Sequence, residues 1–353
     1  MINKRRINGI SHLYLDKTND TYSFFSLGYL IRAMGHGLKI AYVDTQRKST
    51  KIINVFENLS LSYKFTRQFS KLHIETFSFL SKDKISKGII PLVEFQSLNQ
   101  ELFWKNLKNF ELIIFDNIDF KYFDKEKLIS FIKNKSQETE IIITTQNDSD
   151  FEFLIEDVDS AYQLNQKSTT TLLSNKNIVT LTGEGKGKSV YSFGVLFSSF
   201  IKKQDVKLVY FDKGDEFYKE MFFFQSLKIF KKENPHMYGT FDFVQTGNPR
   251  FDGPVPRLEV SSEDIKEAKE ALMLLKTSLK KQTPVVADQL SKAINSNLLT
   301  IKEVIDVLNN VENDLLITGK SMPKEILNLS NKKQEILTRK TPTLEGFYKG
   351  IDF

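Results

Sequence analysis

The chain has 353 residues, enough for about two average domains, and 40% of them are hydrophobic and 27% charged, as in ordinary globular proteins. It has no cysteine, which excludes a disulfide scaffold, a zinc–cysteine site, an iron–sulfur cluster and a cysteine nucleophile. Its four histidines have no ligand spacing, which argues against a histidine-built metal site. The net charge is +6, but the lysines are spread along the chain, so we expect polyphosphate ligands and no nucleic acid.

The N-terminal segment gives no sign of a membrane or secretory protein. The basic start, MINKRRINGI, leads into polar sequence, whereas a secretory signal continues with an apolar stretch. No apolar run reaches the ~18–20 residues that a membrane helix needs. We therefore expect a cytoplasmic protein that does not bind membranes.

A polar, serine- and threonine-rich stretch at residues 166–176 divides the chain nearly in half, and the flanking sequences resemble each other. Residues 15–44 align without a gap on residues 183–212. Later landmarks follow at similar spacings, with Asp116 and Thr144 in the first half matched by Asp288 and Thr318 in the second. The sequence therefore predicts a tandem duplication, in which domains at 1–165 and 177–353 flank a linker at 166–176.

Each half is expected to fold as strand–loop–helix–strand, then helices, then strand–helix–strand. Continuous apolar runs, typical of strands buried on both faces, indicate α/β domains, each with a mostly parallel sheet flanked by helices. In the second half the predicted strands are 177–182, 206–211, 283–288 and 314–319, and the predicted helices are 189–203, 264–281 and 301–313.

A glycine-rich turn, TGEGKGKS at residues 182–189, follows a strand and opens a helix, as a phosphate-binding P-loop does. Its glycines let backbone N–H groups converge on an anion, and the following helix presents its positive end to the same place. Lys188 can reach phosphate oxygens, and the Ser189 hydroxyl is placed to ligate Mg²⁺. The alternative is a turn that only caps the helix. The predicted nucleotide-binding residues of the loop are Gly183, Glu184, Gly185, Lys186, Gly187, Lys188 and Ser189.

The first half lacks this loop. The aligned stretch, YLDKTNDT at residues 14–21, has no glycine, and Asp20 stands where Lys188 stands in the second half. A carboxylate about 4 Å from a phosphate would cost roughly 4 kcal/mol at an effective dielectric near 20. We therefore expect that the first half has lost triphosphate binding and has a structural role.

Several segments resemble the ATP:corrinoid adenosyltransferases, the cob(I)alamin adenosyltransferase family with a RecA-like P-loop fold. The resemblance rests on GEGKGKS (183–189), YFDKG (210–214), LLITGK (315–320), the terminal KGIDF (349–353) and, in the first half, IRAMGHGLKIAYVD (31–44). It covers the second half well and the first half loosely. It implies two tandem RecA-like P-loop NTPase-type domains, the first of them degenerate.

The resemblance implies a transferase in which the cobalt of cob(I)alamin attacks C5′ of ATP, the adenosyl group moves to cobalt, and triphosphate leaves. The P-loop, with Lys188 and with Lys213 of the YFDKG segment, would hold the triphosphate, and Mg²⁺ would neutralise its charge. The nucleophile belongs to the corrinoid, a cobalamin substrate, so the chain needs no nucleophilic side chain. A flavoprotein reductase is the expected source of Co(I).

The residues expected at the metal depart from the family. The family places Asp-Glu after the third buried strand, and here the pair is Asp288-Gln289. An amide oxygen is a weaker ligand than a carboxylate for a hard cation. We expect Ser189, Asp288 and Gln289 around Mg²⁺; the alternative for Asp288 is a satisfied carboxylate at a strand end.

The corrinoid-facing loop, at residues 246–257, also departs. The family has a tryptophan there that covers the corrin, whereas the one tryptophan of this chain, Trp104, lies in the other half. Phe251 is the aromatic candidate for this catalytic role, and the alternative is an ordinary loop anchor.

Three functions remain open at this point. The leading one is a corrinoid adenosyltransferase acting on cob(I)alamin or cob(I)yrinic acid a,c-diamide, with the degenerate first half standing in for the second subunit of the family's dimer as an intramolecular pseudo-dimer. The second is a non-catalytic ATP- or corrinoid-binding protein. The third is a P-loop kinase or ATPase, which would need a carboxylate near the γ-phosphate, with Asp212 and Asp215 as candidates.

Overall fold

The computed structural model describes residues 9–18, 22–36, 38, 40–44, 89–91, 100–120, 124–137, 139–168, 177–211, 220, 223–224, 227, 239–245, 260–280 and 284–341. It divides into two compact units, Met1–Leu164 with Thr338–Phe353, and Asn165–Leu337. The second unit thus ends before the predicted domain end at residue 353. The two-domain boundaries of the sequence analysis stay a prediction.

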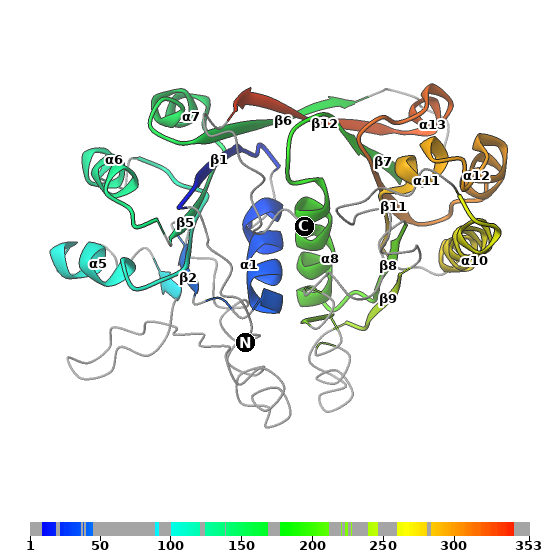
Figure 1. Cartoon of the computed structure of the whole chain (residues 1–353), viewed down its shortest axis with the longest axis horizontal. Helices are drawn as coiled ribbons and strands as arrows, with labels where there is room; N and C mark the ends of the chain where they lie inside the picture. Colours follow the sequence, from blue (N-terminus) through cyan, green and yellow to red (C-terminus); the bar gives the residue numbers. More distant parts are fainter. Residues whose placement is uncertain are drawn as a thin grey trace. The chain divides into compact units, whose positions relative to one another are not determined.

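The first unit is built on parallel strands in the order β3-β2-β4-β5-β1-β6. Helix α1 covers one face of the sheet, and α5, α6 and α7 cover the other (Figure 1). The elements are β1 (Ser11–Leu15), α1 (Phe24–His36), β2 (Ile40–Asp44), β3 (Ile89–Pro91), α5 (Gln100–Leu107), β4 (Leu112–Asp116), α6 (Lys125–Lys133), β5 (Glu140–Thr145), α7 (Asp148–Leu154) and β6 (Ser160–Ser168).

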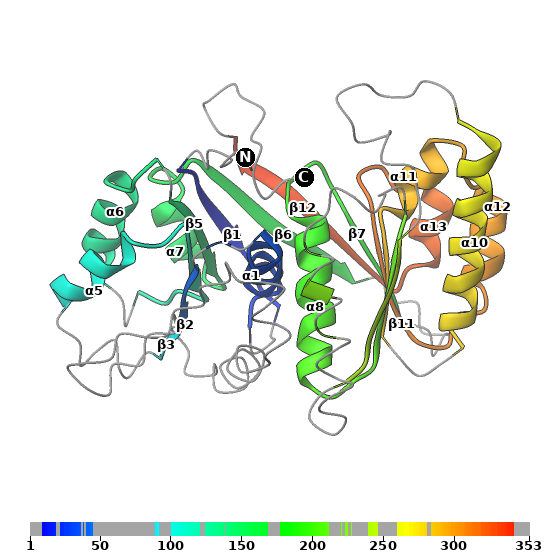
Figure 2. The ribbon, with the colours of Figure 1, turned by 60° about the horizontal axis from the view of Figure 1, so that its bottom comes forward.

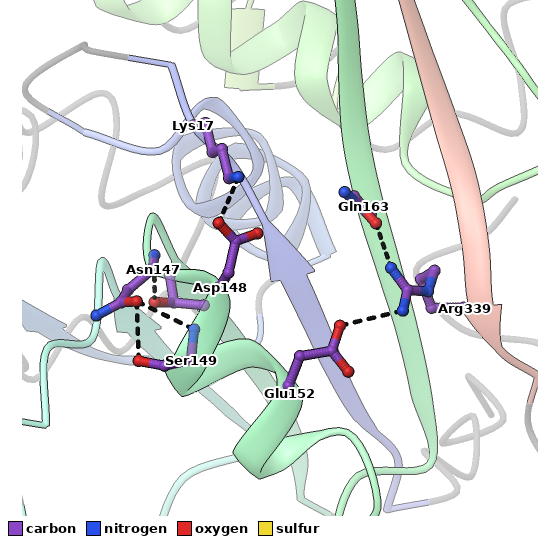
Figure 3. Close-up of polar contacts among 8 residues, drawn as sticks. Lys17, Asn147, Asp148, Ser149, Glu152, Gln163 and Arg339 are labelled. Atoms are coloured by element: carbon purple, nitrogen blue, oxygen red, sulfur yellow. Dashed lines mark hydrogen bonds and ion pairs between the residues drawn. The ribbon is translucent and has the colours of Figure 1, made fainter.

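The last described residues of the chain belong to the first unit through polar contacts around α7 (Figure 3). Arg339 pairs with Glu152 at 3.0 Å and also donates to the side chain of Gln163. Lys340 donates to the carbonyl oxygens of Ile155 and Glu156 at 3.0 and 2.8 Å. These contacts attach Arg339 and Lys340 to the first unit and link positions more than 170 apart in sequence.

The second unit repeats the architecture, with parallel strands in the order β9-β8-β10-β11-β7-β12. Helix α8 lies on one face and α10 to α13 lie on the other (Figure 2). The elements are β7 (Asn177–Thr182), α8 (Lys188–Ile201), β8 (Val206–Tyr210), β9 (Phe241–Gln245), α10 (Ser262–Ser278), β10 (Val285–Asp288), α11 (Leu290–Asn295), α12 (Ile301–Leu308), β11 (Asp314–Thr318), α13 (Lys324–Leu329) and β12 (Lys332–Lys340).

The strand order of the two units is the same when β1 to β6 are matched in turn with β7 to β12. A tandem duplication would leave this identity, but α/β domains of separate origin also share strand orders, so the duplication stays a prediction. The predicted α/β class, with mostly parallel strands flanked by helices, is confirmed. Among the described residues, no helix is long and apolar enough to cross a membrane.

Local sequence sets where the helices begin. Helix α10 starts two residues before the predicted position because Ser261 and Asp264 form a capping box, each side chain accepting the other's backbone N–H. Thr300 and Glu303 do the same at α12. The helices then pack apolar side chains such as Leu275 and Val304 against the sheet. Fully burying such a side chain stabilises the fold by about 1.5–3 kcal/mol.

The glycine in the turn after β11 packs closely against α11. A Cβ at Gly319 would lie 1.7 Å from Oγ and 2.5 Å from Cβ of Ser291 on α11. We expect Gly319→Ala to lower the stability of the protein by about 1–3 kcal/mol through overpacking, measured as a lower midpoint of thermal and urea unfolding. Adding Ser291→Gly removes both atoms and should recover part of the loss. A single variant as stable as the wild type would contradict this packing.

Candidate functional site

The loop between β7 and α8 is shaped by glycines and packed against β12. Gly183 and Gly187 both have a φ of 104°, a backbone conformation that side chains with a Cβ rarely adopt. The N–H of Gly185 donates to the carbonyl oxygen of Ile336 at 3.0 Å, and a Cβ at Gly185 would lie 2.5 Å from Cγ2 of Ile336. The predicted glycines are therefore required by positive φ and by close approach to β12.

Lys188, the first residue of α8, folds back into this loop. Its ammonium donates to the carbonyl oxygens of Gly183 and Gly185, at 2.7 Å each. Burial lowers the pKa of Lys188 to about 8, against the opposing attraction of Glu184 and Asp288. The loop thus holds a partly buried cation, next to the N-terminal end of a helix, where an anion is favoured.

The next residue, Ser189, faces the end of β10. Its hydroxyl donates to Oδ2 of Asp288 at 2.8 Å, and the Asp288 side chain is fully buried. The side-chain amide nitrogen of Gln289 lies 3.5 Å from the same hydroxyl. The structure therefore brings the three predicted metal residues together.

A fourth residue, Thr318 at the end of β11, completes the cluster. Its hydroxyl donates to Oδ1 of Asp288 at 2.5 Å and accepts the backbone N–H of Gln289 at 3.0 Å. Each oxygen of the carboxylate therefore accepts a short hydrogen bond from a hydroxyl, and the Ser192 hydroxyl lies 3.4 Å from Oδ1. Thr318 was a landmark of the internal repeat but was not among the predicted site residues, because no local motif marks it.

The oxygen ligands gathered here suit Mg²⁺, which prefers carboxylates, hydroxyls, water and phosphate oxygens. Asp288 is the one carboxylate in contact with Ser189, and within the described part of the chain no group of three or more His, Cys, Asp or Glu could hold a metal ion. The residues fit an ion that takes its remaining ligands from a bound polyphosphate and from water.

Glu184 does not point at the loop centre but pairs with Lys320, the residue two positions after β11, at 2.5 Å. Both side chains are about two-thirds exposed, with relative areas of 70% and 66%, so the pair contributes little stability. The pair places a second lysine beside the loop. Sequence reasoning missed Lys320 as a site residue, although it ends the LLITGK segment.

Other predicted residues lie outside the described part of the chain, and their roles stay predictions. They are Asp20, Asp212, Lys213, Asp215, the corrinoid-facing loop 246–257 with Phe251, and the terminal segment 349–353.

The first unit repeats the strand-end cluster without the glycine loop. Thr144 donates to Asp116 at 3.1 Å and accepts the N–H of Asn117 at 2.8 Å, as Thr318 does with Asp288 and Gln289. Ser23 takes the place of Ser189, since its backbone N–H donates to Asp116 at 3.3 Å. The hydrogen bonds therefore match Ser23 with Ser189, two residues beyond the ungapped alignment.

The first unit has a buried carboxylate directly after β1, where the second unit has its glycine loop after β7. Asp16, directly after β1, accepts the N–H of Thr18 at 3.1 Å and the hydroxyls of Thr18 and Ser23 at 2.6 and 2.8 Å. Full burial raises the pKa of Asp16 despite these hydrogen bonds. Donors that could bind a phosphate are thus already used, which supports the expected loss of triphosphate binding in this unit.

The family model of the ATP:corrinoid adenosyltransferase BtuR/CobO/CobP matches residues 174–353, which include the whole of the glycine loop and the Asp288 cluster. No curated protein matches the chain.

The low pKa of Lys188 gives the site a pH dependence. Without a ligand, the Lys188 ammonium loses its proton near pH 8. A bound polyphosphate favours the charged ammonium and raises the pKa of Lys188. We expect affinity for inorganic triphosphate to fall as pH rises from 8 to 10, and binding at pH 8.5 to take up a proton. Calorimetry in buffers of different ionisation enthalpy measures that uptake; Lys188→Met should abolish it. Uptake unchanged in Lys188→Met would assign it to another group.

Proposed function

Because the chain belongs to the ATP:corrinoid adenosyltransferase family, we propose that its second half transfers the 5′-deoxyadenosyl group of ATP to the Co(I) of a corrinoid. The cobalt lone pair forms the Co–C bond at C5′, the C5′–O bond breaks, and triphosphate leaves with that electron pair. The corrinoid is cob(I)alamin or cob(I)yrinic acid a,c-diamide, and a flavoprotein reductase supplies Co(I) in the cytoplasm.

One observation carries the proposal: Lys188 and Ser189 start α8 directly after a glycine loop, Lys188 reaches back into that loop, and the Ser189 hydroxyl donates to the buried carboxylate of Asp288. Loop N–H groups and Lys188 bind the triphosphate, and in doing so Lys188 exchanges two carbonyl oxygens for phosphate oxygens. These groups hold C5′ in place for attack and stabilise the charge that develops on the leaving group.

Ser189, Asp288 and Gln289 are the residues that would hold Mg²⁺, which when bound neutralises charge on the triphosphate. Asp288 then serves as a fixed anionic acceptor that orients the Ser189 hydroxyl at 2.8 Å. Gln289 contributes an amide where the family has a carboxylate, so this cluster carries one negative charge fewer.

Two further assignments belong to the same proposal. Phe251 covers the corrin in place of the family's tryptophan, and Lys213 adds a cation on the triphosphate. The degenerate first half, which has the buried carboxylate of Asp16 where the second has its glycine loop, binds no nucleotide and supports the competent half as an intramolecular pseudo-dimer.

The alternative of a non-catalytic ATP- or corrinoid-binding protein is favoured by Gln289 and by the absence of tryptophan from residues 246–257. A kinase or ATPase would need a carboxylate near the γ-phosphate, for which Asp212 and Asp215, outside the described residues, are the candidates. The intact lysine and serine of the loop support ATP binding in all three cases.

The direct test supplies chemically reduced cob(I)alamin and MgATP to the purified full chain and measures adenosylcobalamin and free triphosphate. Equal amounts of both products would support the transferase. Tight ATP binding without product would favour the non-catalytic alternative, and release of orthophosphate would favour an ATPase.

We expect Lys188→Ala to weaken ATP binding by at least about a hundredfold, because it removes a charge-assisted contact from a partly buried site. Calorimetry with MgATP measures the affinity. Lys266→Ala is the control, since Lys266 is an exposed lysine of α10 that pairs with Glu263 at 3.5 Å, and it should bind as the wild type does. Unchanged ATP affinity in Lys188→Ala would defeat the P-loop assignment.

Gln289→Glu restores the carboxylate of the family. We expect it to lower the Mg²⁺ concentration needed for half-maximal adenosyl transfer several-fold, because a carboxylate binds a hard cation more strongly than an amide does. Titration of Mg²⁺ at saturating ATP measures this. A loss of turnover at every Mg²⁺ concentration would show instead that the site depends on the amide.

A further inference from the structure

We propose that Thr318 is a positioning residue of the nucleotide site, which fixes Asp288 and the backbone of Gln289 so that both face Ser189. The inference rests on the proposed function, since it concerns the same site. Thr318 itself touches neither the loop nor Lys188 among the contacts described above, and it acts through its two neighbours.

The Thr318 hydroxyl has two partners at once. It donates to Oδ1 of Asp288 at 2.5 Å, which leaves Oδ2 for Ser189, and it accepts the N–H of Gln289 at 3.0 Å. Ser192 also reaches Oδ1, but at 3.4 Å, a weak contact. Without Thr318, the carboxylate would therefore lose its short hydrogen bond on one side and be free to rotate toward other donors.

The second partner, the N–H of Gln289, belongs to a strained turn. Gln289 has a φ of 61°, in the left-handed region that a residue with a side chain adopts only with backbone strain. The hydrogen bond from its N–H to Thr318 holds the backbone in this conformation, and the turn brings the Gln289 amide to 3.5 Å from the Ser189 hydroxyl. One buried hydroxyl thus orients two of the three residues expected at the metal.

The first unit supplies an internal comparison. Thr144 makes the same two hydrogen bonds, to Asp116 and from the N–H of Asn117, and Asn117 also has a positive φ, 49°. Thr144 and Thr318 are both fully buried at the ends of matched strands. Removing either hydroxyl therefore removes both of these contacts, and Thr144 also lies 3.1 Å from the Ser26 hydroxyl. Only the Thr318 cluster adjoins a glycine loop with its lysine.

The experiment compares Thr318→Val with Thr144→Val in the full chain. Valine keeps the shape of threonine and removes the hydroxyl. ATP affinity is measured by calorimetry with Mg²⁺ and again with excess EDTA, kcat and KM are measured for adenosyl transfer, and thermal unfolding gives the structural cost. Thr318→Ser keeps the hydroxyl and serves as the conservative variant.

We expect both valine variants to lose similar thermal stability. Mg²⁺ should raise the ATP affinity of Thr318→Val by a factor about tenfold smaller than it does in the wild type. The kcat of this variant should fall by a larger factor than its KM rises. Its affinity in EDTA should change little, because Lys188 and the loop are intact. Thr318→Ser should stay within a fewfold of the wild type, and Thr144→Val should bind MgATP as the wild type does.

Two outcomes would overturn the inference: Thr318→Val binding MgATP as tightly as Thr144→Val does, or Thr318→Ser being as impaired as Thr318→Val. If a valine variant does not fold, Thr318→Ala and Thr144→Ala repeat the comparison. If the wild-type chain binds ATP but forms no adenosylcobalamin, the proposed transferase is contradicted. The MgATP affinities of Thr318→Val and Thr144→Val then still test whether Thr318 positions the nucleotide site.

Discussion

The buried carboxylate of Asp288 is the interaction on which the site depends. A buried charge costs several kcal/mol unless it is hydrogen-bonded, and here each oxygen accepts a hydroxyl, from Ser189 on α8 and from Thr318 on β11. The acceptor sits on β10, so one side chain ties together three elements. Any rearrangement that separated them would leave the carboxylate unpaired, and this fixes the first turn of α8 relative to the strand ends.

The two units differ in the loop and agree in this cluster. The first keeps the hydroxyl-bonded carboxylate of Asp116 and has a second buried carboxylate, Asp16, directly after β1. The second has a glycine loop there, into which Lys188 donates. The two units thus share the strand-end cluster, and the difference in proposed function rests on the group beside it, a carboxylate or an ammonium.

The sequence predicted the central strands well, because each is a short, continuous apolar run. The glycine-loop motif predicted Lys188 and Ser189 beside a phosphate, and the family resemblance predicted Asp288 next to them. Sequence reasoning missed Thr318 and the packing of Gly185 on Ile336, since these contacts join residues about 30 and 150 positions apart and leave no local pattern. The ungapped alignment pairs residue 21 with Ser189, whereas the N–H that reaches Asp116 belongs to Ser23; the duplication stays a prediction. Phe251 stays a prediction.

The geometry of Lys188 also changes its chemistry toward reagents other than phosphates. An amine whose pKa is about 8 is largely unprotonated in mildly alkaline solution, where ordinary lysines remain charged and unreactive. Acylating reagents small enough to enter the loop would therefore modify Lys188 ahead of most of the exposed lysines, and a ligand in the loop would protect it. The extent of Lys188 acylation, measured by mass spectrometry, would therefore show whether a ligand occupies the loop, without an engineered label.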